Sequence, residues 1–543
     1  MRLASDTTDR GSWLDDIDGP ASWGMLPAEN IRYEGCMTTS LIDNLMRQAK
    51  THPMRSALVS DGFDMGWHDL ADTVLRLSNV LRQMGVSSED RVALLCPNRP
   101  AYVMCWLALA NLGAVAVSIN TSLVGRGLRY SIEQSKSSVI LAEKALWGEK
   151  SGDLEELVAD RDLIAFEDEA DLIGQASETE PDDHFRGRPG DPFSIIYTSG
   201  TTGFPKGVVN SQSVFVASGR WMAEYLEITS NDRIMVFLPL FHTNPQMYAV
   251  ASALETGCAL IIRPKFSANN LFADARRFEA TLFTYVGTVL SMLCNRQKYP
   301  NRDHSLTRCV GGGCPSEVLD TMRDRFGITA HELYGMTEVG GWVTGTRTGS
   351  ARRGTCGTVR PDMDVRIADE NDHDCAPGER GEILVRPAAP DVMFSGYFDN
   401  AEASWSASRN FWFHTGDAGS IDAEGVLSFH GRMREIIRRG GENISPTEIE
   451  MVLLDHPAVT DAACVGVPDK VWGEEIKVFL VADGLSGSDV LSFLEGRLAP
   501  FMMPRFVQFT ATIPRTQTEK IQRDALKKDR TNEIDLAAEV SDA

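Results

Sequence analysis

The spacing of apolar residues predicts alternating helices and strands over the first part of the chain. Leu70–Met84 has apolar side chains at helical spacing, and Arg91–Cys96 is a mostly apolar run closed by the turn Pro97–Asn98, as expected of a buried strand. The same alternation continues from Leu41 to about Phe326. Because strands that alternate with helices usually form a parallel or mixed sheet covered by helices, we predict a layered α/β fold.

The pattern changes near Gly354. From there to Phe429, short alternating runs are separated by Gly and Asp turns; examples are Val365–Ile367, Gly381–Val385 and Gly425–Phe429. This spacing predicts a β-rich subdomain over residues 354–430.

A second change follows Gly431. Glu448–Asp455 is amphipathic, Val459–Val467 is strand-like, and Val490–Leu498 has helical spacing. These runs predict a small α+β domain.

A chain of 543 residues is too long for one hydrophobic core. We expect a large domain over residues 1–431, which begins with a surface arm at residues 1–35, and a small domain over residues 432–543. The last residues, from Asp529, are expected to be frayed.

Composition narrows the class of protein. A net charge of -23 disfavours nucleic acid and anionic lipid as partners. The ten cysteines form no Cys-x-x-Cys pair and show no zinc spacing, which favours reduced thiols in a cytoplasmic protein. Met1–Asp16 has no signal-peptide pattern, and the longest apolar runs, Val103–Val117 and Cys258–Ile262, are shorter than the roughly 20 residues of a membrane helix. We expect a monomer or homodimer.

The strongest chemical signal is the segment Ser194–Val209, which reads SIIYTSGTTGFPKGVV. A short apolar strand leads into a loop whose glycines let the backbone approach a polyphosphate. The backbone N–H groups, including that of Gly200, can donate to phosphate oxygens. Further donors are the Lys206 ammonium group and the hydroxyls of Thr198, Ser199, Thr201 and Thr202. A Walker loop would need Ser or Thr directly after the lysine, but Gly207 follows here, so the loop serves a different nucleotide chemistry.

The run YTSGTTGFPKGV resembles the signature of the acyl-adenylate-forming superfamily, which includes acyl-CoA ligases, peptide-synthetase adenylation domains and beetle luciferases. The resemblance extends from about Leu41 to Arg523, with the motifs in the family's order. It implies a large domain of αβαβα-type layers and a small domain that rotates between two half-reactions. The spellings PLFHTN and TEK most resemble carnitine- and crotonobetaine-type CoA ligases.

Two further segments resemble the family's nucleotide site. Leu333–Gly340 reads LYGMTEVG, where the resemblance implies a base-stacking Tyr334 beside Gly335, an α-phosphate donor in Thr337 and a magnesium ligand in Glu338. Thr202 is assigned to the same metal. Val310–Ser316 reads VGGGCPS and implies that Gly312 and Gly313 lie beside the adenine and the acyl pocket.

The C-terminal half supplies the remaining expected contacts. In FHTGD, Asp417 would bind the ribose hydroxyls, and Arg432 would contact the ribose and phosphates. Arg434 occupies the hinge position, where Lys or Asp is usual. The coenzyme A tunnel would be lined by Gly440, Gly441 and Glu442.

Lys520 matches the lysine that bridges the carboxylate and the α-phosphate during adenylation. The residue before it is often Gly in the family, and here it is Glu519. We expect that if either half-reaction is impaired, it is adenylation, because only that step uses Lys520.

Further residues are expected to form the acyl pocket. In Pro239–Gln246, PLFHTNPQ, His242 is the candidate gate, although a histidine satisfied in the core is the alternative. The stretch lacks the aspartate that usually anchors an amino acid. Small residues suggest room for a bulky or long acid: Gly287, Gly311, Gly312, Gly313, Gly340 and Gly341.

Together these features predict an acyl-CoA ligase that uses ATP, Mg²⁺ and coenzyme A to activate a hydrophobic carboxylic acid, which is bulky or of medium to long chain, in secondary metabolism. Alternatives are an enzyme that mainly performs the thioester-forming half-reaction on an acyl-adenylate, and a stand-alone adenylation domain that serves a carrier protein. A luciferase-type oxygenase and a non-catalytic adenylate-binding protein stay open.

Overall fold

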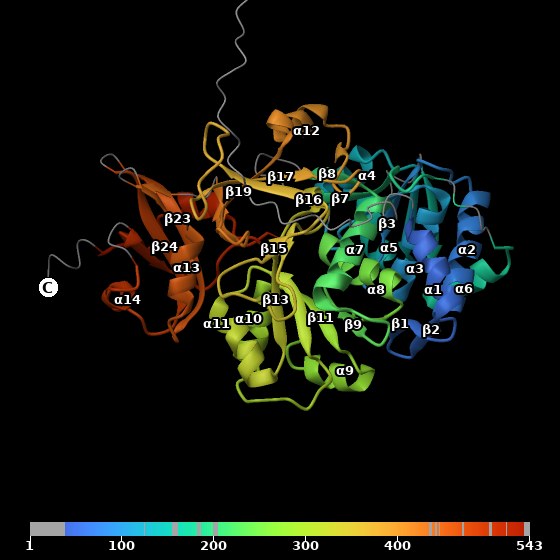
Figure 1. Cartoon of the computed structure of the whole chain (residues 1–543), viewed down its shortest axis with the longest axis horizontal. Coiled ribbons are helices and arrows are strands. Elements are labelled where there is room, and N and C mark those ends of the chain that lie inside the picture. Colours follow the sequence, from blue (N-terminus) through green and yellow to red (C-terminus); the bar gives the residue numbers. More distant parts are fainter. Residues whose placement is uncertain are drawn as a thin grey trace, which may run out of the picture.

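The computed structural model describes residues 39–123, 125–154, 161–181, 185, 187–198, 205–433, 437–439, 442–444, 446–469, 472–498, 502–516 and 519–536. These residues form two large sheets, a smaller third sheet and a separate C-terminal sheet (Figure 1). The α/β prediction is therefore confirmed. None of the helices in these ranges is long and apolar enough to cross a membrane.

The first large sheet is parallel in its centre and antiparallel at both edges, with strand order β15-β14-β13-β12-β11-β9-β10-β1-β2. Its strands are β1 (Ser56–Ser60), β2 (Phe63–Gly66), β9 (Arg233–Val236), β10 (Ala259–Ile262), β11 (Leu282–Val286), β12 (Arg308–Gly312), β13 (Thr329–Tyr334), β14 (Thr344–Gly345) and β15 (Thr358–Val359).

The second large sheet has the order β18-β8-β7-β4-β3-β5-β6 and is antiparallel only where β8 joins β7 and β18. Its strands are β3 (Arg91–Leu95), β4 (Val115–Ser118), β5 (Val139–Glu143), β6 (Asp162–Phe166), β7 (Pro192–Thr198), β8 (Lys206–Ser211) and β18 (Gly396–Tyr397).

Helices fill the space between the two large sheets, where one apolar core contacts both (Figure 1). The inner helices are α1 (Leu41–Thr51), α2 (Trp67–Gln83), α3 (Pro100–Leu112), α6 (Glu169–Ser177), α7 (Gln212–Leu226), the π-helix η3 (Pro245–Val250) and α8 (Ala251–Thr256). The predicted helix at Leu70–Met84 is α2, and the predicted strand at Arg91–Cys96 is β3. The apolar run at Val103–Val117 covers most of α3 and the start of β4. It is apolar because every residue of α3 is buried between the layers.

Outer helices cover the far face of each large sheet. On the first sheet they are α9 (Leu271–Phe278), α10 (Gly287–Arg296), α11 (Ser316–Thr321) and the π-helix η4 (Met322–Phe326). On the second they are α4 (Gly125–Gln134) and α5 (Lys144–Leu154). The result is the αβαβα layering that the resemblance implied.

The third sheet has the order β16-β17-β19-β20 and lies beside the large layers. It contains β16 (Met363–Ala368), β17 (Gly381–Pro387), β19 (Phe413–Ile421) and β20 (Leu427–Arg432), with α12 (Ala401–Ala407) and the 3-10 turn η6 (Arg409–Phe411) nearby. The strands expected at Val365–Ile367 and Gly381–Val385 are β16 and β17. The strand expected from Gly425 begins only at Leu427, because Asp422–Gly425 forms a hydrogen-bonded turn.

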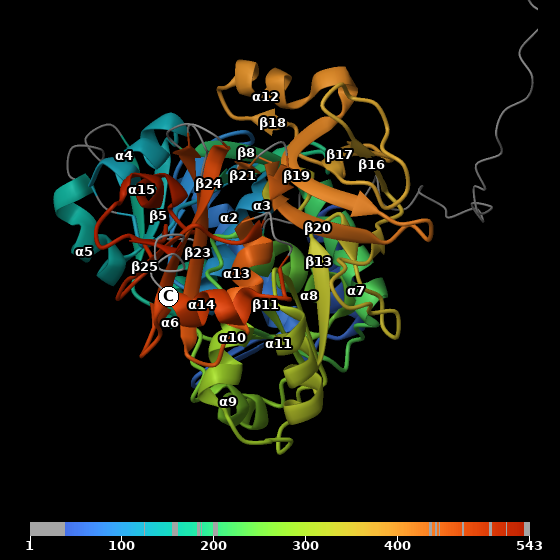
Figure 2. The same cartoon turned by 90° about the vertical axis from the view of Figure 1, so that its left-hand side faces the viewer.

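The C-terminal sheet lies to one side of the large body in Figure 1 and in front of it in Figure 2. Its strands are β21 (Ile437–Arg439), β22 (Glu442–Ile444), β23 (Val459–Asp469), β24 (Gly473–Ala482), β25 (Phe506–Phe509) and β26 (Ile534–Asp535), and its helices are α13 (Pro446–Leu454), α14 (Gly487–Leu494) and α15 (Arg523–Lys528). Helix α14 starts earlier than predicted, because Ser486 and Asp489 form a capping box.

The expectation that the chain is frayed from Asp529 is wrong as far as Leu536. Strand β26 pairs with β25, and Leu536 is buried. Lys477, fully buried on β24, donates hydrogen bonds to the Asp529 carbonyl and to Glu533, each at 2.6 Å. A buried ammonium group needs such partners, so the segment is held in place.

Candidate functional site

The phosphate loop joins two antiparallel strands. β7 ends at Thr198 and β8 begins at Lys206, and these two residues are register partners. The Lys206 ammonium lies 4.7 Å from the centre of the Tyr397 ring. The loop residues Ser199, Gly200, Thr201 and Thr202 lie outside the described residues, so their roles stay predictions.

Glu338 reaches the ends of this loop from another sheet. It lies with Thr337 in a short 3-10 turn between β13 and β14, and both residues are buried. The Thr198 hydroxyl donates to Glu338 Oε1 at 3.4 Å, and the Tyr397 hydroxyl donates to the same oxygen at 3.1 Å. The Thr337 hydroxyl is 2.7 Å from that of Thr243, which follows His242 in the chain.

This donor set suits magnesium held mainly by a nucleotide. Mg²⁺ commonly uses one or two carboxylates together with phosphate oxygens and water. Within the described ranges no three His, Cys, Asp or Glu residues are grouped as a metal cage. A single carboxylate beside a hydroxyl and a lysine therefore fits a cation that arrives with triphosphate.

Three side chains from two sheets meet at Asp417. Asp417 on β19 is the register partner of Arg432 on β20, and Arg432 Nε lies 2.8 Å from Asp417 Oδ1. The Tyr334 hydroxyl, at the end of β13, donates to Asp417 Oδ2 at 2.8 Å. Burial and the neighbouring carboxylate raise the pKa of Tyr334 well above its usual range, so the hydroxyl stays a donor. A buried carboxylate held in this way can accept from vicinal hydroxyls.

The Tyr334 ring also has a neighbour that sequence reasoning missed. Phe429 on β20 stacks on it, with ring centres 5.6 Å apart and planes inclined by 27°. Phe429 is 37% exposed, so part of this aromatic surface is open to a ligand. The signal in the sequence was weak, because an aromatic residue in an alternating strand is ordinary.

The Gly-rich segment is anchored by a buried carboxylate. Glu332 on β13 accepts from the backbone N–H of Gly313 at 3.1 Å and from the Tyr285 hydroxyl at 2.6 Å. Burial raises the pKa of Glu332 to about 7. Gly313 has a φ of +78°, and a Cβ there would meet open space, whereas one at Gly312 would lie 2.7 Å from the Leu333 carbonyl. Glu332 was missed because nothing in its local sequence distinguishes it from a surface residue.

The glycines do not create the space that was expected of them. Added Cβ atoms at Gly287, Gly311, Gly312, Gly340 and Gly341 would each lie within 3 Å of protein atoms. Gly335 is equally confined, since its Cβ would lie 2.2 Å from the Gly341 carbonyl. At five of these positions glycine allows close backbone packing, and at Gly341 the Met247 side chain fills the space, so the argument for a roomy pocket was wrong there. Of the glycines in the predicted site, Gly313 faces open space.

Lys520, far along the chain, lies close enough to His242 to act on it electrostatically. Burial, with a smaller contribution from the positive charge of Lys520, lowers the pKa of His242 to about 4. The imidazole is therefore neutral near pH 7, and its ring centre lies 4.6 Å from that of Phe241. Lys520 itself is exposed, in a tight loop where its N–H donates to the Thr516 hydroxyl at 3.1 Å.

The remaining predicted residues are less informative. Arg434, Gly440 and Gly441 lie outside the described residues, and of Glu442 only the backbone, in β22, is described. Glu519 has a φ of +61°, in the left-handed region that glycine adopts without strain. The structure thereby explains why a glycine suits this position.

Two family models match the chain. The model of the AMP-binding enzyme covers residues 45–398, and that of the AMP-binding enzyme C-terminal domain covers residues 448–520.

Several characterised proteins are similar over most of their length. Indoleacetate–CoA ligase of Aromatoleum aromaticum is 32% identical over 497 residues, 89% of this chain and 96% of that protein. Feruloyl-CoA synthase of an Amycolatopsis species is 32% identical over 491 residues, with 89% and 97% covered. Crotonobetaine/carnitine–CoA ligase of Salmonella paratyphi A is 29% identical over 476 residues, with 84% and 92% covered. Among solved structures, o-succinylbenzoate CoA synthetase of Bacillus subtilis with its acyl-adenylate intermediate superposes with a TM-score of 0.81, 28% identity, and 90% and 99% coverage.

Proposed function

Because this chain belongs to the AMP-binding enzyme family and is a ligase of the acyl-CoA synthetase kind, we propose that it makes an acyl-CoA in two steps. The carboxylate of the acid attacks the α-phosphate of ATP, so that acyl-AMP forms and pyrophosphate leaves. The thiol of coenzyme A then attacks the acyl carbon and releases AMP. The observation that carries the proposal is that one segment, Tyr334–Glu338, contacts Asp417 through Tyr334 and contacts Thr198 and Tyr397 through Glu338.

The first step needs positive charge where two anions meet. A carboxylate approaching the α-phosphate is repelled unless cations and oriented donors offset the charge, and such electrostatic stabilisation is usually the largest catalytic contribution. We assign this role to Lys520 and to the Thr337 hydroxyl. Glu338 would hold magnesium, which would neutralise the departing pyrophosphate, and Lys206 would contact the same phosphates.

The nucleoside would be fixed by the cluster at Asp417. Its carboxylate would accept from both ribose hydroxyls, which would compete there with Tyr334 and Arg432. The base would lie near Tyr334 and Gly313, whose positive φ and open side leave room for a flat ring. Thr201 and Thr202 complete the predicted phosphate and metal contacts.

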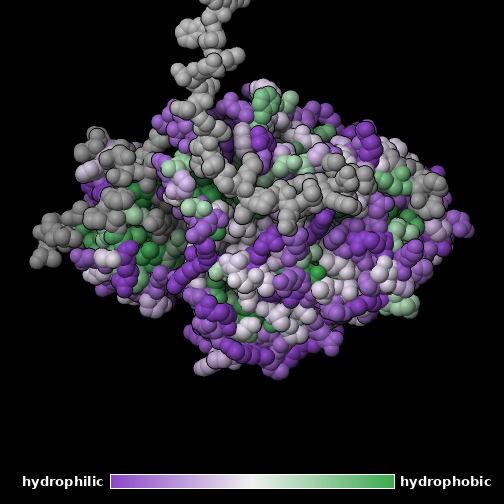
Figure 3. All heavy atoms as spheres, in the orientation of Figure 1, coloured by the Kyte–Doolittle hydropathy of each residue, from purple (hydrophilic) through white to green (hydrophobic). Residues whose placement is uncertain are grey.

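The second step would use a different placement of the C-terminal sheet. Lys520 lies close enough to His242 to act on it electrostatically, which would suit adenylation, and thioester formation would need Lys520 to move away. In Figure 3 apolar residues gather over the C-terminal sheet, while hydrophilic residues dominate the rest of that face. Met451 and Leu454 of α13 are 43% and 38% exposed. Exposed apolar side chains of this kind suit a surface that packs against another part of the chain in a second arrangement. We propose that residues 432–543 rotate and bring Gly440–Glu442 to the site.

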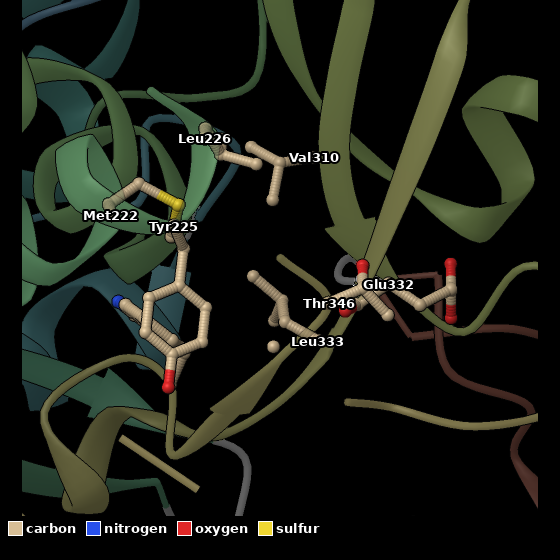
Figure 4. Close-up of a pocket in the computed structure, with 9 residues that line it drawn as sticks. Met222, Tyr225, Leu226, Val310, Glu332, Leu333 and Thr346 are labelled. Carbon is tan, nitrogen blue, oxygen red and sulfur yellow. Dashed lines mark hydrogen bonds between the residues drawn. The ribbon is translucent and has the colours of Figure 1, made fainter. Parts of the chain in front are cut away.

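The acid is proposed to be hydrophobic. A small void, with room for about one water molecule, lies between α7 and strands β12–β14 (Figure 4). Its side chains include Met222, Leu226, Val310 and Leu333, and the Glu332 carboxylate points away from it. Such a lining favours the hydrocarbon end of an acid over a charged end. Neighbouring side chains would have to move before this void admitted an acyl group, so bulky aryl acids and acids of medium to long chain both stay open.

A screen of acids tests the proposal. The protein is incubated with ATP, Mg²⁺ and single acids, including indoleacetate, ferulate, carnitine and straight-chain acids of graded length. We expect release of pyrophosphate with hydrophobic acids, and acyl-CoA by mass spectrometry only after coenzyme A is added. Pyrophosphate exchange with amino acids but no acyl-CoA would instead favour the carrier-protein alternative, and acyl-adenylate binding without turnover would exclude an enzyme.

The same screen bears on the finer predictions. The acid identified would place the reaction in secondary metabolism or elsewhere, and size-exclusion chromatography with light scattering would separate monomer from homodimer. Fractionation of cells that produce the protein would test the cytoplasmic location.

A further inference from the structure

Tyr397 occupies a position between the two ends of the phosphate loop and the Glu338 carboxylate, although no motif in the sequence marks it. It lies in the short strand β18, which pairs antiparallel with β8 through Gly396–Val209 and Tyr397–Val208. The next residue, Phe398, donates its N–H to the Gly207 carbonyl at 2.8 Å. The backbone of β18 is therefore attached to the strand that begins with Lys206.

The Tyr397 side chain makes two polar contacts with opposite charges. Its hydroxyl donates to Glu338 Oε1 at 3.1 Å, and the face of its ring lies 4.7 Å from the Lys206 ammonium. A phenol hydroxyl can orient a carboxylate, and the ring face attracts a cation. Phe394 packs edge-on against the ring at 5.4 Å and restricts its rotation.

The hydrogen bonds to Glu338 are unevenly distributed between its two oxygens. Thr198 and Tyr397 both donate to Oε1, and within the described part of the chain no hydrogen bond to Oε2 accompanies them. Oε2 is thus the oxygen that a magnesium ion would use. Burial and the negative charge of Glu338 raise the pKa of Tyr397 above its usual range, which keeps the phenol protonated as a donor.

We propose that Tyr397 is a positioning residue that aims Glu338 Oε2 at the metal and holds Lys206 on the opposite side of the phosphates. The inference rests on the proposed function, since it assumes that Mg²⁺ and ATP bind here. It predicts that the hydroxyl matters for nucleotide that arrives with magnesium, and much less for nucleotide without it.

The main test is Tyr397→Phe, which removes the hydroxyl but keeps the ring beside Lys206. Isothermal titration with a non-hydrolysable ATP analogue, in Mg²⁺ and in EDTA, measures binding independently of turnover. A hydrogen bond to a charged group justifies an expected loss of about 10-fold in affinity with Mg²⁺. In EDTA we expect less than about a twofold change, since the proposed contact acts through the metal ligand.

A matched control removes another tyrosine hydroxyl near the same loop. Tyr130 donates to the Pro205 carbonyl at 3.2 Å, and among the contacts of the described residues none joins it to Glu338. Tyr130→Phe should therefore change affinity by the same factor in Mg²⁺ and in EDTA. If Tyr397→Phe behaves like Tyr130→Phe, the residue merely supports the loop and the proposal is wrong.

A double-mutant cycle provides an independent test. In a Glu338→Gln background, Tyr397→Phe should cost almost nothing further, because the carboxylate it orients is already lost. Full additivity of the two losses would contradict the proposal. A thermal melt shows whether Tyr397→Phe folds properly. If it does not, Thr198→Val removes the second donor to Glu338 Oε1 and should cause a smaller loss of affinity with Mg²⁺. Failure of the wild-type protein to bind the analogue at all would instead refute the proposed function.

Discussion

Replacing Glu519 by glycine is expected to speed acyl-adenylate formation and to leave thioester formation unchanged. Glu519 immediately precedes Lys520 and has a φ of +61°. The loop is held by its neighbours, since Glu519 N donates to the Thr516 carbonyl at 3.0 Å and Arg515 donates to the Glu519 carbonyl at 2.9 Å. The strained conformation is thus maintained by contacts that also position Lys520.

Two effects of this substitution have the same sign. The left-handed conformation costs a residue with a Cβ about 1 kcal/mol relative to glycine. The Glu519 carboxylate also attracts the positive charge of the adjacent Lys520, an interaction worth roughly 0.5 kcal/mol for neighbouring exposed charges in water. If both act on the delivery of Lys520, adenylation should accelerate by about three- to tenfold. The free energy of unfolding should change by less than about 0.5 kcal/mol, because the greater freedom of glycine in the unfolded chain offsets the relief.

The two half-reactions are measured separately. Exchange of labelled pyrophosphate into ATP reports adenylation, and the reaction of a synthetic acyl-adenylate with coenzyme A reports thioester formation. Glu519→Gln is the matched control, because it removes the charge but keeps the Cβ. We expect it to show only the smaller, electrostatic part of the gain, about twofold.

Three outcomes would refute the reasoning. Equal acceleration of both half-reactions would show that Glu519 does not act through Lys520. Slower adenylation in Glu519→Gly would show that the left-handed conformation of Glu519 does not hinder the delivery of Lys520. If Glu519→Gln accelerated adenylation as much as Glu519→Gly, the backbone conformation would contribute nothing to the effect.

Three further substitutions test buried features of the fold. Burial raises the pKa of Glu332 from 4.5 to about 7, so the wild type should lose stability relative to Glu332→Gln as the pH rises through that window, by at most about 3 kcal/mol. Urea unfolding of both proteins at pH 5 and pH 8 measures this, and a difference that does not depend on pH would contradict it. Leu333→Ala should cost about 2 to 5 kcal/mol of stability and shift kcat/KM toward longer or bulkier acids, whereas an unchanged ranking of acids would separate the cavity from the substrate site. Lys477→Met should remove the buried donor to the Asp529 carbonyl and to Glu533, which would keep its ion pair with Arg530, and should cost about 1 to 3 kcal/mol; hydrogen exchange over residues 529–536 should become faster, and unchanged protection there would show that β26 alone holds the segment.

Much of the chemistry was predictable because it is encoded in contiguous segments. The phosphate loop, LYGMTEVG and FHTGD each place the residue types that indicate their chemistry within a few positions of one another. The α/β alternation follows from the periodicity of apolar residues. The roles of Ser199, Gly200, Thr201, Thr202, Gly440 and Gly441 stay predictions, since they lie outside the described residues. The frayed C-terminus was predicted wrongly because the partner of that segment, Lys477, lies on another strand.

The sequence by itself therefore determined the layers, the family and the candidate residues, but the tertiary structure decided which of them act together. Tyr397 contacts Glu338, Thr198 contacts Glu338, and Tyr334 contacts Asp417, across separations of 59, 140 and 83 residues. Such contacts join residues on different sheets, and no periodicity or local motif records them. The same holds for the glycines, whose need for close packing depends on backbone brought near by the fold, and for Lys520, whose charge acts on His242 from a distant part of the chain.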